Sequence, residues 1–141
     1  SYNLSWSSDD RRIAYTHVDS LRDMQVWVVN ADGTGAHPVT RFPASDGRPQ
    51  WPAWSPDDRK IAVQAGTRDR QNPTIITGHI WLVDLSTGDA TKLAAHDEPY
   101  VDETPSWFPD GKHLAFQSNR TGRMEIWVMG ADGTGVRRVT K

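Results

Sequence analysis

Apolar residues recur along this 141-residue chain in short runs that are separated by turn-forming residues. The most apolar runs lie at 25–30, 79–84 and 125–130, and each is centred on a tryptophan with apolar residues at consecutive positions. A strand that is apolar at consecutive positions is covered on both faces. No segment repeats apolar residues at i, i+3, i+4 and i+7 over the length that a helix needs. The pattern therefore predicts an all-β fold whose central strands are buried.

The predicted strands form a unit of four that occurs three times. In each unit the first strand ends on a tryptophan, the second follows an Asp-Asp or Asp-Gly turn, the third is the tryptophan-centred run, and the fourth is short and charged. The expected ranges are 2–6, 12–17, 25–30 and 36–40; then 50–54, 60–65, 79–84 and 89–94; then 103–107, 113–118, 125–130 and 136–140. A period of about 50 residues is typical of repeat architectures.

The repeat explains six of the seven tryptophans. Trp6, Trp54 and Trp107 end the first strands, and Trp27, Trp81 and Trp127 lie in the third strands. Large side chains at fixed positions of a repeat are expected to be structural anchors of its core. Only Trp51 falls outside the pattern and needs a separate explanation.

A four-stranded unit with a doubly covered middle and an exposed last strand is typical of a β-propeller blade. The predicted fourth strands mix Arg, Lys and Thr with Pro38, as suits a solvent-facing edge. A sandwich would alternate apolar and polar residues throughout. We therefore predict an all-β propeller segment of three four-stranded antiparallel blades, half of a six-bladed ring. The expected blades are 1–44, 45–97 and 98–141.

The second unit carries additional residues at 66–78, between its second and third strands. They are expected to lengthen the second hairpin of that blade. Insertions in repeat proteins collect on loops at one rim, and long loops are often functional. A tolerated surface insertion is the alternative.

The repeats resemble a known family. Trp-Ser-Pro-Asp-Asp-Arg-Lys-Ile-Ala at 54–62 and Glu-Ile-Trp-Val-Met-Gly-Ala-Asp-Gly-Thr-Gly-Val-Arg-Arg-Val-Thr at 125–140 resemble the WD40-like (PD40-type) repeat of TolB-like propellers. The resemblance covers the chain in three copies, whereas propellers of that family carry six to eight blades. It implies a propeller in the periplasm or outside the cell that binds a peptide or protein partner. The family also includes propellers of prolyl-oligopeptidase-like peptidases.

Composition narrows the chemistry. A formal net charge of −2 argues against a nucleic-acid partner, and the absence of cysteine excludes disulfides, cysteine-based zinc sites and thiol nucleophiles. No run of about 18 apolar residues occurs, so no membrane insertion is expected. The sequence lacks a Gly-x-Ser-x-Gly elbow, and its five histidines have no ligand-like spacing. We expect a non-catalytic protein without a cofactor. The alternative is the propeller part of an enzyme, either the gate of a peptidase or a metal-assisted lyase or hydrolase.

Candidate binding residues lie in the segments that lead into the first strands of the second and third blades, because these segments do not repeat. The first strand of each blade lines the central channel of a propeller. The candidates for a ligand at the channel mouth are Asp46, Arg48, Trp51, His96, Tyr100, Asp102 and Glu103. Trp51 and Tyr100 either cap the core or form an aromatic lip for a peptide.

Asp102 and Glu103 are the candidates for a metal site, because they immediately precede the channel strand of the third blade. Converging carboxylates would hold a divalent cation through oxygen ligands or receive a basic group of a partner. The resemblance to TolB-like propellers adds calcium in the channel as an option. Solvated loop charge is the alternative.

Three blades leave two outer sheet faces without neighbours. They would expose more apolar surface than a monomer usually tolerates. A two-fold homodimer that sets blade 1 of one chain against blade 3 of the other would close a ring of six blades. The alternative is that these residues are a piece of a longer chain.

Overall fold

The computed structural model describes residues 3–18, 23–42, 47–68, 71 and 76–141, and its strands form three four-stranded sheets. Blade 1 consists of β1 (Leu4–Trp6), β2 (Arg12–Val18), β3 (Met24–Asn30) and β4 (His37–Pro38). Blade 2 consists of β5 (Gln50–Trp54), β6 (Lys60–Arg68), β7 (Ile76–Asp84) and β8 (Ala90–Leu93). Blade 3 consists of β9 (Asp102–Trp107), β10 (His113–Ser118), β11 (Glu125–Gly130) and β12 (Arg137–Arg138). The described residues contain no helix that could cross a membrane.

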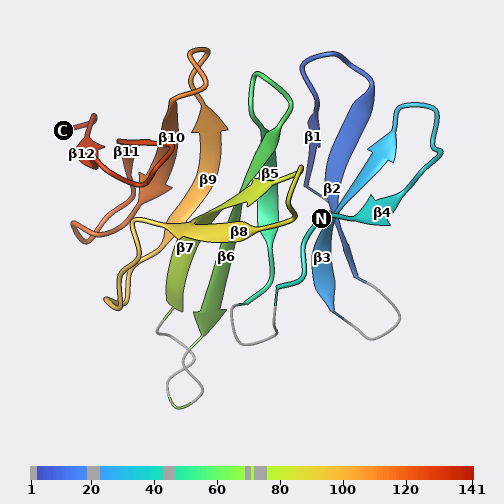
Figure 1. Ribbon diagram of the computed structural model, residues 1–141. Coiled ribbons are helices and arrows are strands. Elements are labelled where there is room, and N and C mark those ends of the chain that lie inside the picture. The colour runs from blue at the N-terminus through green and yellow to red at the C-terminus, as the bar shows by residue number, and fades with distance from the viewer. Residues whose placement is uncertain (1–2, 19–22, 43–46, 69–70, 72–75) are drawn as a thin grey trace.

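Within each blade, strands that follow one another in sequence pair antiparallel. Figure 1 shows the three sheets side by side, with blade 2 between blade 1 and blade 3. The prediction of an all-β fold built from three four-stranded antiparallel blades is therefore confirmed.

Each first hairpin is set by an aspartate after the leading tryptophan. In blade 1 the Ser7 hydroxyl donates to Asp9 at 2.6 Å, and in blade 2 Ser55 donates to Asp57 at 2.6 Å. These hydroxyls are the first cause of the lowered pKa of both carboxyl groups. The turn then needs a positive φ, which Asp58 adopts at 59° and which Gly111 supplies in blade 3 at 66°.

The fourth strands and the second hairpin of blade 2 differ in length from their predicted ranges. The fourth strands are shorter than expected because the Thr40 hydroxyl, and not a backbone carbonyl, accepts the Val26 N–H. Thr140 takes the same role for Ile126 in blade 3. In blade 2 the hairpin of β6 and β7 is longer than expected, because its ladder continues to the pair Arg68–Ile76 inside the insertion.

The core lies in two layers, one at each join between blades. The first layer packs Val26 and Val28 of blade 1 against Ile61 and Val63 of blade 2. The second packs Ala62, Ile80 and Leu93 of blade 2 against Leu114, Phe116 and Met129 of blade 3. Burial of aliphatic side chains is the main force that holds neighbouring blades together.

The leading tryptophans also link neighbouring blades through hydrogen bonds. The Trp54 indole donates to the Ser5 carbonyl of blade 1 at 3.0 Å, and the Trp107 indole donates to the Ala53 carbonyl of blade 2 at 3.0 Å. Trp54 is 7% exposed. Trp6, which has no blade of this chain in front of it, is 49% exposed.

Candidate functional site

The structure brings three of the seven predicted site residues together at one rim of the molecule. His96 and Tyr100 lie in the segment between β8 and β9, and Asp102 begins β9. They meet Arg120, which lies in the turn between β10 and β11. We call His96, Tyr100, Asp102 and Arg120, together with His79 of β7, the His96 cluster.

An ion pair forms the base of the His96 cluster. Asp102 is 1% exposed, and both of its carboxylate oxygens accept from Arg120 Nη2, at 2.7 and 2.9 Å. Arg120 Nε also donates to the Ser118 hydroxyl at 3.0 Å. A buried carboxylate needs such a partner, because an unpaired charge there would be costly.

Flat groups stack above this ion pair. The rings of His96 and Tyr100 lie 3.6 Å apart and nearly parallel, and the Arg120 guanidinium lies over Tyr100 at 4.9 Å and over Trp127 at 4.6 Å. Guanidinium groups over aromatic faces are favourable contacts. Burial raises the pKa of Tyr100. His96 Nε2 is buried without a hydrogen-bond partner, 3.7 Å from Asp102 Oδ2.

His79 fixes the segment that carries His96. Its Nε2–H donates to the His96 carbonyl at 2.8 Å, and the two rings lie 4.4 Å apart. Burial, as the largest cause, lowers the pKa of His79, so the ring is neutral at pH 7. The cluster is thus a stack of rings above an ion pair in which one arginine balances one aspartate.

The remaining candidates lie apart from the cluster. Trp51 is 45% exposed in a left-handed conformation with φ 55°, and it lines a hollow of about 300 Å3 with Pro52 and Thr104. Arg48 is exposed, and Asp46 lies outside the described residues. Glu103 is half-buried and pairs with Gln117 across the β9–β10 ladder.

The carboxylates of Asp102 and Glu103 do not fit a calcium site as the structure arranges them. Arg120 already occupies both oxygens of Asp102, and successive residues of a strand point to opposite faces. Among the described residues no three His, Asp or Glu side chains are grouped as a metal would require. The His96 cluster consists of stacked rings above one buried ion pair.

Arg120, which organises the cluster, is not among the residues that the sequence pattern indicates. In the sequence Arg120 is one basic residue in a turn of blade 3, and Asp102, with which it pairs, comes 18 positions earlier. Only the antiparallel pairing of β9 with β10 brings the two together, with Ser118 opposite Asp102.

Comparisons with known proteins agree with the propeller fold. The sequence model of the family described as "TolB beta propeller domain" matches residues 3–141. An uncharacterised protein of Agrobacterium fabrum is 32% identical over 115 residues, which cover 75% of this chain and 36% of that protein. The Tol-Pal system protein TolB of Alcanivorax borkumensis is 34% identical over 98 residues, which cover 70% of this chain and 20% of that protein.

Solved structures are similar over almost the whole chain. The structure of a putative TolB from Agrobacterium tumefaciens matches with a TM-score of 0.79 and 26% identity, over 99% of this chain and 46% of that one. An oligogalacturonate lyase from Vibrio parahaemolyticus matches with a TM-score of 0.71 at 15% identity, over 94% of this chain and 38% of that one, a likeness that shows the fold alone. This chain therefore spans less than half the length of these relatives and structures.

Proposed function

The chain belongs to the TolB β-propeller family, and we propose that it is a non-catalytic half-ring. In this proposal a second copy covers its two end faces, and the closed ring binds a peptide or protein partner at the channel mouth. One observation carries the proposal. The two end faces repeat, position by position, the sheet faces that are buried between blades inside the chain.

The open face of blade 3 has the composition of a covered face. Ile126 and Val128 stand at the positions that Ile80 and Leu82 hold in blade 2, next to the third-strand tryptophan. Ile80 is fully buried by blade 3, whereas Ile126 is 44% exposed. A hollow on this face has a volume of about 750 Å3 and is lined by Phe108, Val128 and residues of the neighbouring turns. The exposed Ile126 is the apolar contact that a second copy would cover on this face.

The open face of blade 1 is its counterpart. Ile13, Tyr15 and Trp27 stand at the positions of Ile61, Val63 and Trp81, the residues that blade 2 packs against blade 1. The same chain thus presents a covering face at one end and a receiving face at the other. Two such chains, related by a two-fold axis, would make both contacts at once.

The two end blades also carry the donor and the acceptor of the hydrogen bond that links neighbouring blades inside the chain. Ser5 binds Trp54 twice, because its carbonyl accepts the indole N–H at 3.0 Å and its hydroxyl accepts the backbone N–H at 3.3 Å. Ser106 is the residue of blade 3 that corresponds to Ser5. In a closed ring, Trp6 of one copy would therefore bind Ser106 of the second copy.

One contact would not be reproduced at that join. Asp58 accepts the Ser8 backbone N–H at 2.6 Å and the Ser8 hydroxyl at 2.8 Å. At the closing join the corresponding pair is Asp10 and Pro109, and proline has no N–H to donate. The join would therefore rest on apolar packing and on the Trp6–Ser106 bonds.

In this proposal the partner binds at the rim of the channel mouth, at the His96 cluster and Trp51. A stack of rings with a guanidinium suits the aromatic and charged side chains of a peptide, and the exposed Trp51, which lies apart from the cluster, would offer such a peptide a further aromatic contact. The relative named as a Tol-Pal system protein belongs to a protein assembly by its name, which supports a protein partner.

Sedimentation velocity across protein concentrations tests the assembly. We expect a species of twice the 15.8 kDa chain mass at micromolar concentration. A species of one chain mass at about 100 μM would contradict the proposal. The Ile126→Asp variant is the matched control, because it places a charge on the receiving face without touching the His96 cluster.

A further inference from the structure

One hollow is shared by the first strands of all three blades, β1, β5 and β9. Its volume is about 300 Å3, and its whole lining belongs to two repeated positions, three and two residues before the leading tryptophan of each blade. We call it the first-strand hollow; its lining is Asn3, Leu4, Trp51, Pro52, Thr104 and Pro105. Each blade of one copy thus contributes one pair of neighbouring residues to its walls.

The backbone at the first of these positions is strained in blades 2 and 3. Trp51 and Thr104 have φ of 55° and 51°, and each precedes a proline. A left-handed conformation is rare for a β-branched residue such as threonine, and a following proline restricts the backbone further. The ladder with the second strand also shifts register there in both blades. Bulges re-aim side chains and strained residues gather at ligand sites, so the repeated distortion indicates a binding role for this position.

The polar side chains of the first-strand hollow are not used by the fold. The Asn3 amide, the Trp51 indole N–H and the Thr104 hydroxyl make no hydrogen bond to another described residue. By contrast, the indoles of Trp54 and Trp107 both donate to a carbonyl of the preceding blade at 3.0 Å. Each of the three free groups has a hydrogen to donate. The hollow therefore offers a ligand one donor from each blade.

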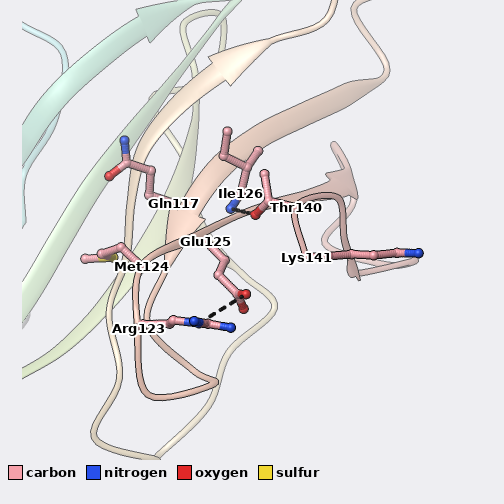
Figure 2. A pocket seen from close by; sticks show the side chains of 7 residues that line it. All are labelled: Gln117, Arg123, Met124, Glu125, Ile126, Thr140 and Lys141. Atoms are coloured by element: carbon pink, nitrogen blue, oxygen red, sulfur yellow. Dashed lines mark hydrogen bonds and ion pairs between the residues drawn. The ribbon is translucent and has the colours of Figure 1, made fainter.

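The rest of the lining is apolar, and none of it is charged. The two prolines are buried, whereas Leu4 is 60% exposed and Trp51 is 45% exposed. Figure 2 shows a hollow of the opposite kind beside the β10–β11 turn, where Arg123 Nε lies 3.7 Å from Glu125 Oε1. A charged group of a ligand thus finds no counter-charge in the lining of the first-strand hollow, while an apolar ring finds an exposed indole.

We propose that the first-strand hollow binds a proline-rich segment of a partner in the polyproline II conformation. Proline rings of the segment pack on Trp51 and Leu4. Its backbone carbonyls accept from the Trp51 indole, the Asn3 amide and the Thr104 hydroxyl. A polyproline II segment has no internal hydrogen bonds, and its prolines have no N–H that would need an acceptor. Donors that come from three successive blades suit such an extended ligand, and aromatic-lined grooves are its usual sites.

This inference deepens the proposed function, because it names a subsite and a class of sequence for the peptide partner. It rests on that proposal only for the ligand being a peptide. The walls of the first-strand hollow all come from one copy, so binding does not require the dimer. The His96 cluster, from which Trp51 lies apart, would contact another part of the same peptide.

The probe is acetyl-hexaproline-amide, which is uncharged. Titration up to about 10 mM, followed by NMR of the Trp51 indole N–H and the Leu4 methyl groups, should saturate with a Kd of about 1 mM, as expected for a small contact with few hydrogen bonds. An acetylated Gly-Ser hexapeptide amide should not saturate, because it is flexible and has no rings. Absence of saturation by hexaproline would overturn the inference. Saturation by maltose alone would assign the hollow to a neutral sugar and overturn it as well.

Four variants assign the binding to named groups. Trp51→Phe keeps a ring but removes the N–H and should weaken binding about fivefold, and Thr104→Val removes the hydroxyl at nearly constant shape and should weaken it about threefold. Leu4→Ser should weaken binding about fivefold. Met124→Ser is the matched control, because Met124 is also an exposed apolar residue, at 47%, but lies in the hollow of Figure 2. Equal loss in Met124→Ser would place the peptide elsewhere and contradict the assignment.

Sedimentation velocity on the same samples separates this inference from the assembly. If hexaproline saturates a monomeric protein with the expected variant pattern, the assembly fails and the first-strand hollow stands. If the protein dimerises and hexaproline does not saturate, the assembly stands and the inference is overturned. If the protein dimerises and hexaproline saturates with that pattern, both proposals stand.

Discussion

The two faces of blade 2 and the two end faces of the chain are built from corresponding residues, yet only the faces of blade 2 are covered. Ile80 is fully buried and Ile126 is 44% exposed, although both precede a third-strand tryptophan and both are isoleucine. Trp54 and Trp6 differ in the same way, with 7% and 49% exposure. The exposed fractions differ because a neighbouring blade covers each face of blade 2, whereas no blade of this chain covers the end faces. Equivalent substitutions at covered and open positions therefore separate folding from assembly.

The largest difference in stability between a covered and an open position is expected when aspartate replaces the isoleucine before the third-strand tryptophan. Ile80→Asp places an unpaired carboxylate in the core between blades 2 and 3 and should cost about 4 kcal/mol or more of the free energy of unfolding. Ile126→Asp should change the stability of a single copy little but abolish self-association. Thermal unfolding and sedimentation velocity measure the two effects. Similar loss of folding in both variants would contradict the comparison.

A smaller difference is expected for the indole hydrogen bond. Trp54→Phe leaves the Ser5 carbonyl without its donor and should lower the free energy of unfolding by about 1–3 kcal/mol. Trp6→Phe should leave the unfolding of a single copy unchanged and weaken dimerisation, because the Trp6–Ser106 bond occurs once at each of two joins. Dimer dissociation constants and denaturant unfolding check the pair. Unchanged dimerisation in Trp6→Phe would exclude the proposed register of the join.

Much of this fold could be predicted from local patterns, because a blade is made by local rules. Consecutive apolar residues marked the third strands, and the aspartate after each leading tryptophan marked a turn, in which Ser7 binds Asp9 and Ser55 binds Asp57. The fourth strands were overestimated, since a threonine hydroxyl ends each ladder in blades 1 and 3 in a way that apolar patterning does not register.

The candidate site was predicted less well, because it depends on contacts between segments that local rules do not relate. His96, Tyr100 and Asp102 were found as unusual residues before a channel strand, and the structure brings them together. The stack and the ion pair depend on Arg120, which reaches Asp102 only through strand pairing. Asp102 and Glu103 are adjacent in sequence, but neighbours on a strand face opposite ways, so adjacency alone does not bring their carboxylates together.

His79 of blade 2 and Gln25, which holds the same position in blade 1, allow a test of how stability depends on pH. The lowered pKa of His79 means that the folded protein binds the additional proton less tightly than the unfolded chain does. The stability it supports is complete above the ordinary value of 6.5 and is lost as pH falls through that value toward the lowered pKa. His79→Gln should reduce this loss between pH 7 and pH 5, since Gln25 holds the corresponding backbone in blade 1.

The reverse substitution is the matched control for that test. Gln25→His should add a loss of stability on acidification, because a buried histidine would then hold Phe42 as His79 holds His96. Chemical denaturation at pH 7, 6 and 5 gives the difference between each variant and the wild type. An unchanged pH dependence in both variants would show that other groups govern the acid response.

The smallest effect is expected for calcium at the channel rim. A ligand that binds the folded protein stabilises it in proportion to its occupancy, so about 5 mM calcium should raise Tm by several degrees if a site exists. Because Arg120 holds both oxygens of Asp102 and Glu103 belongs to a different face of β9, we expect a shift below about 1 °C. A larger shift that disappears in Glu103→Gln would mean that calcium displaces Arg120 from Asp102. The rim would then recognise charge through its carboxylates, and the guanidinium released from the ion pair would become available to a partner.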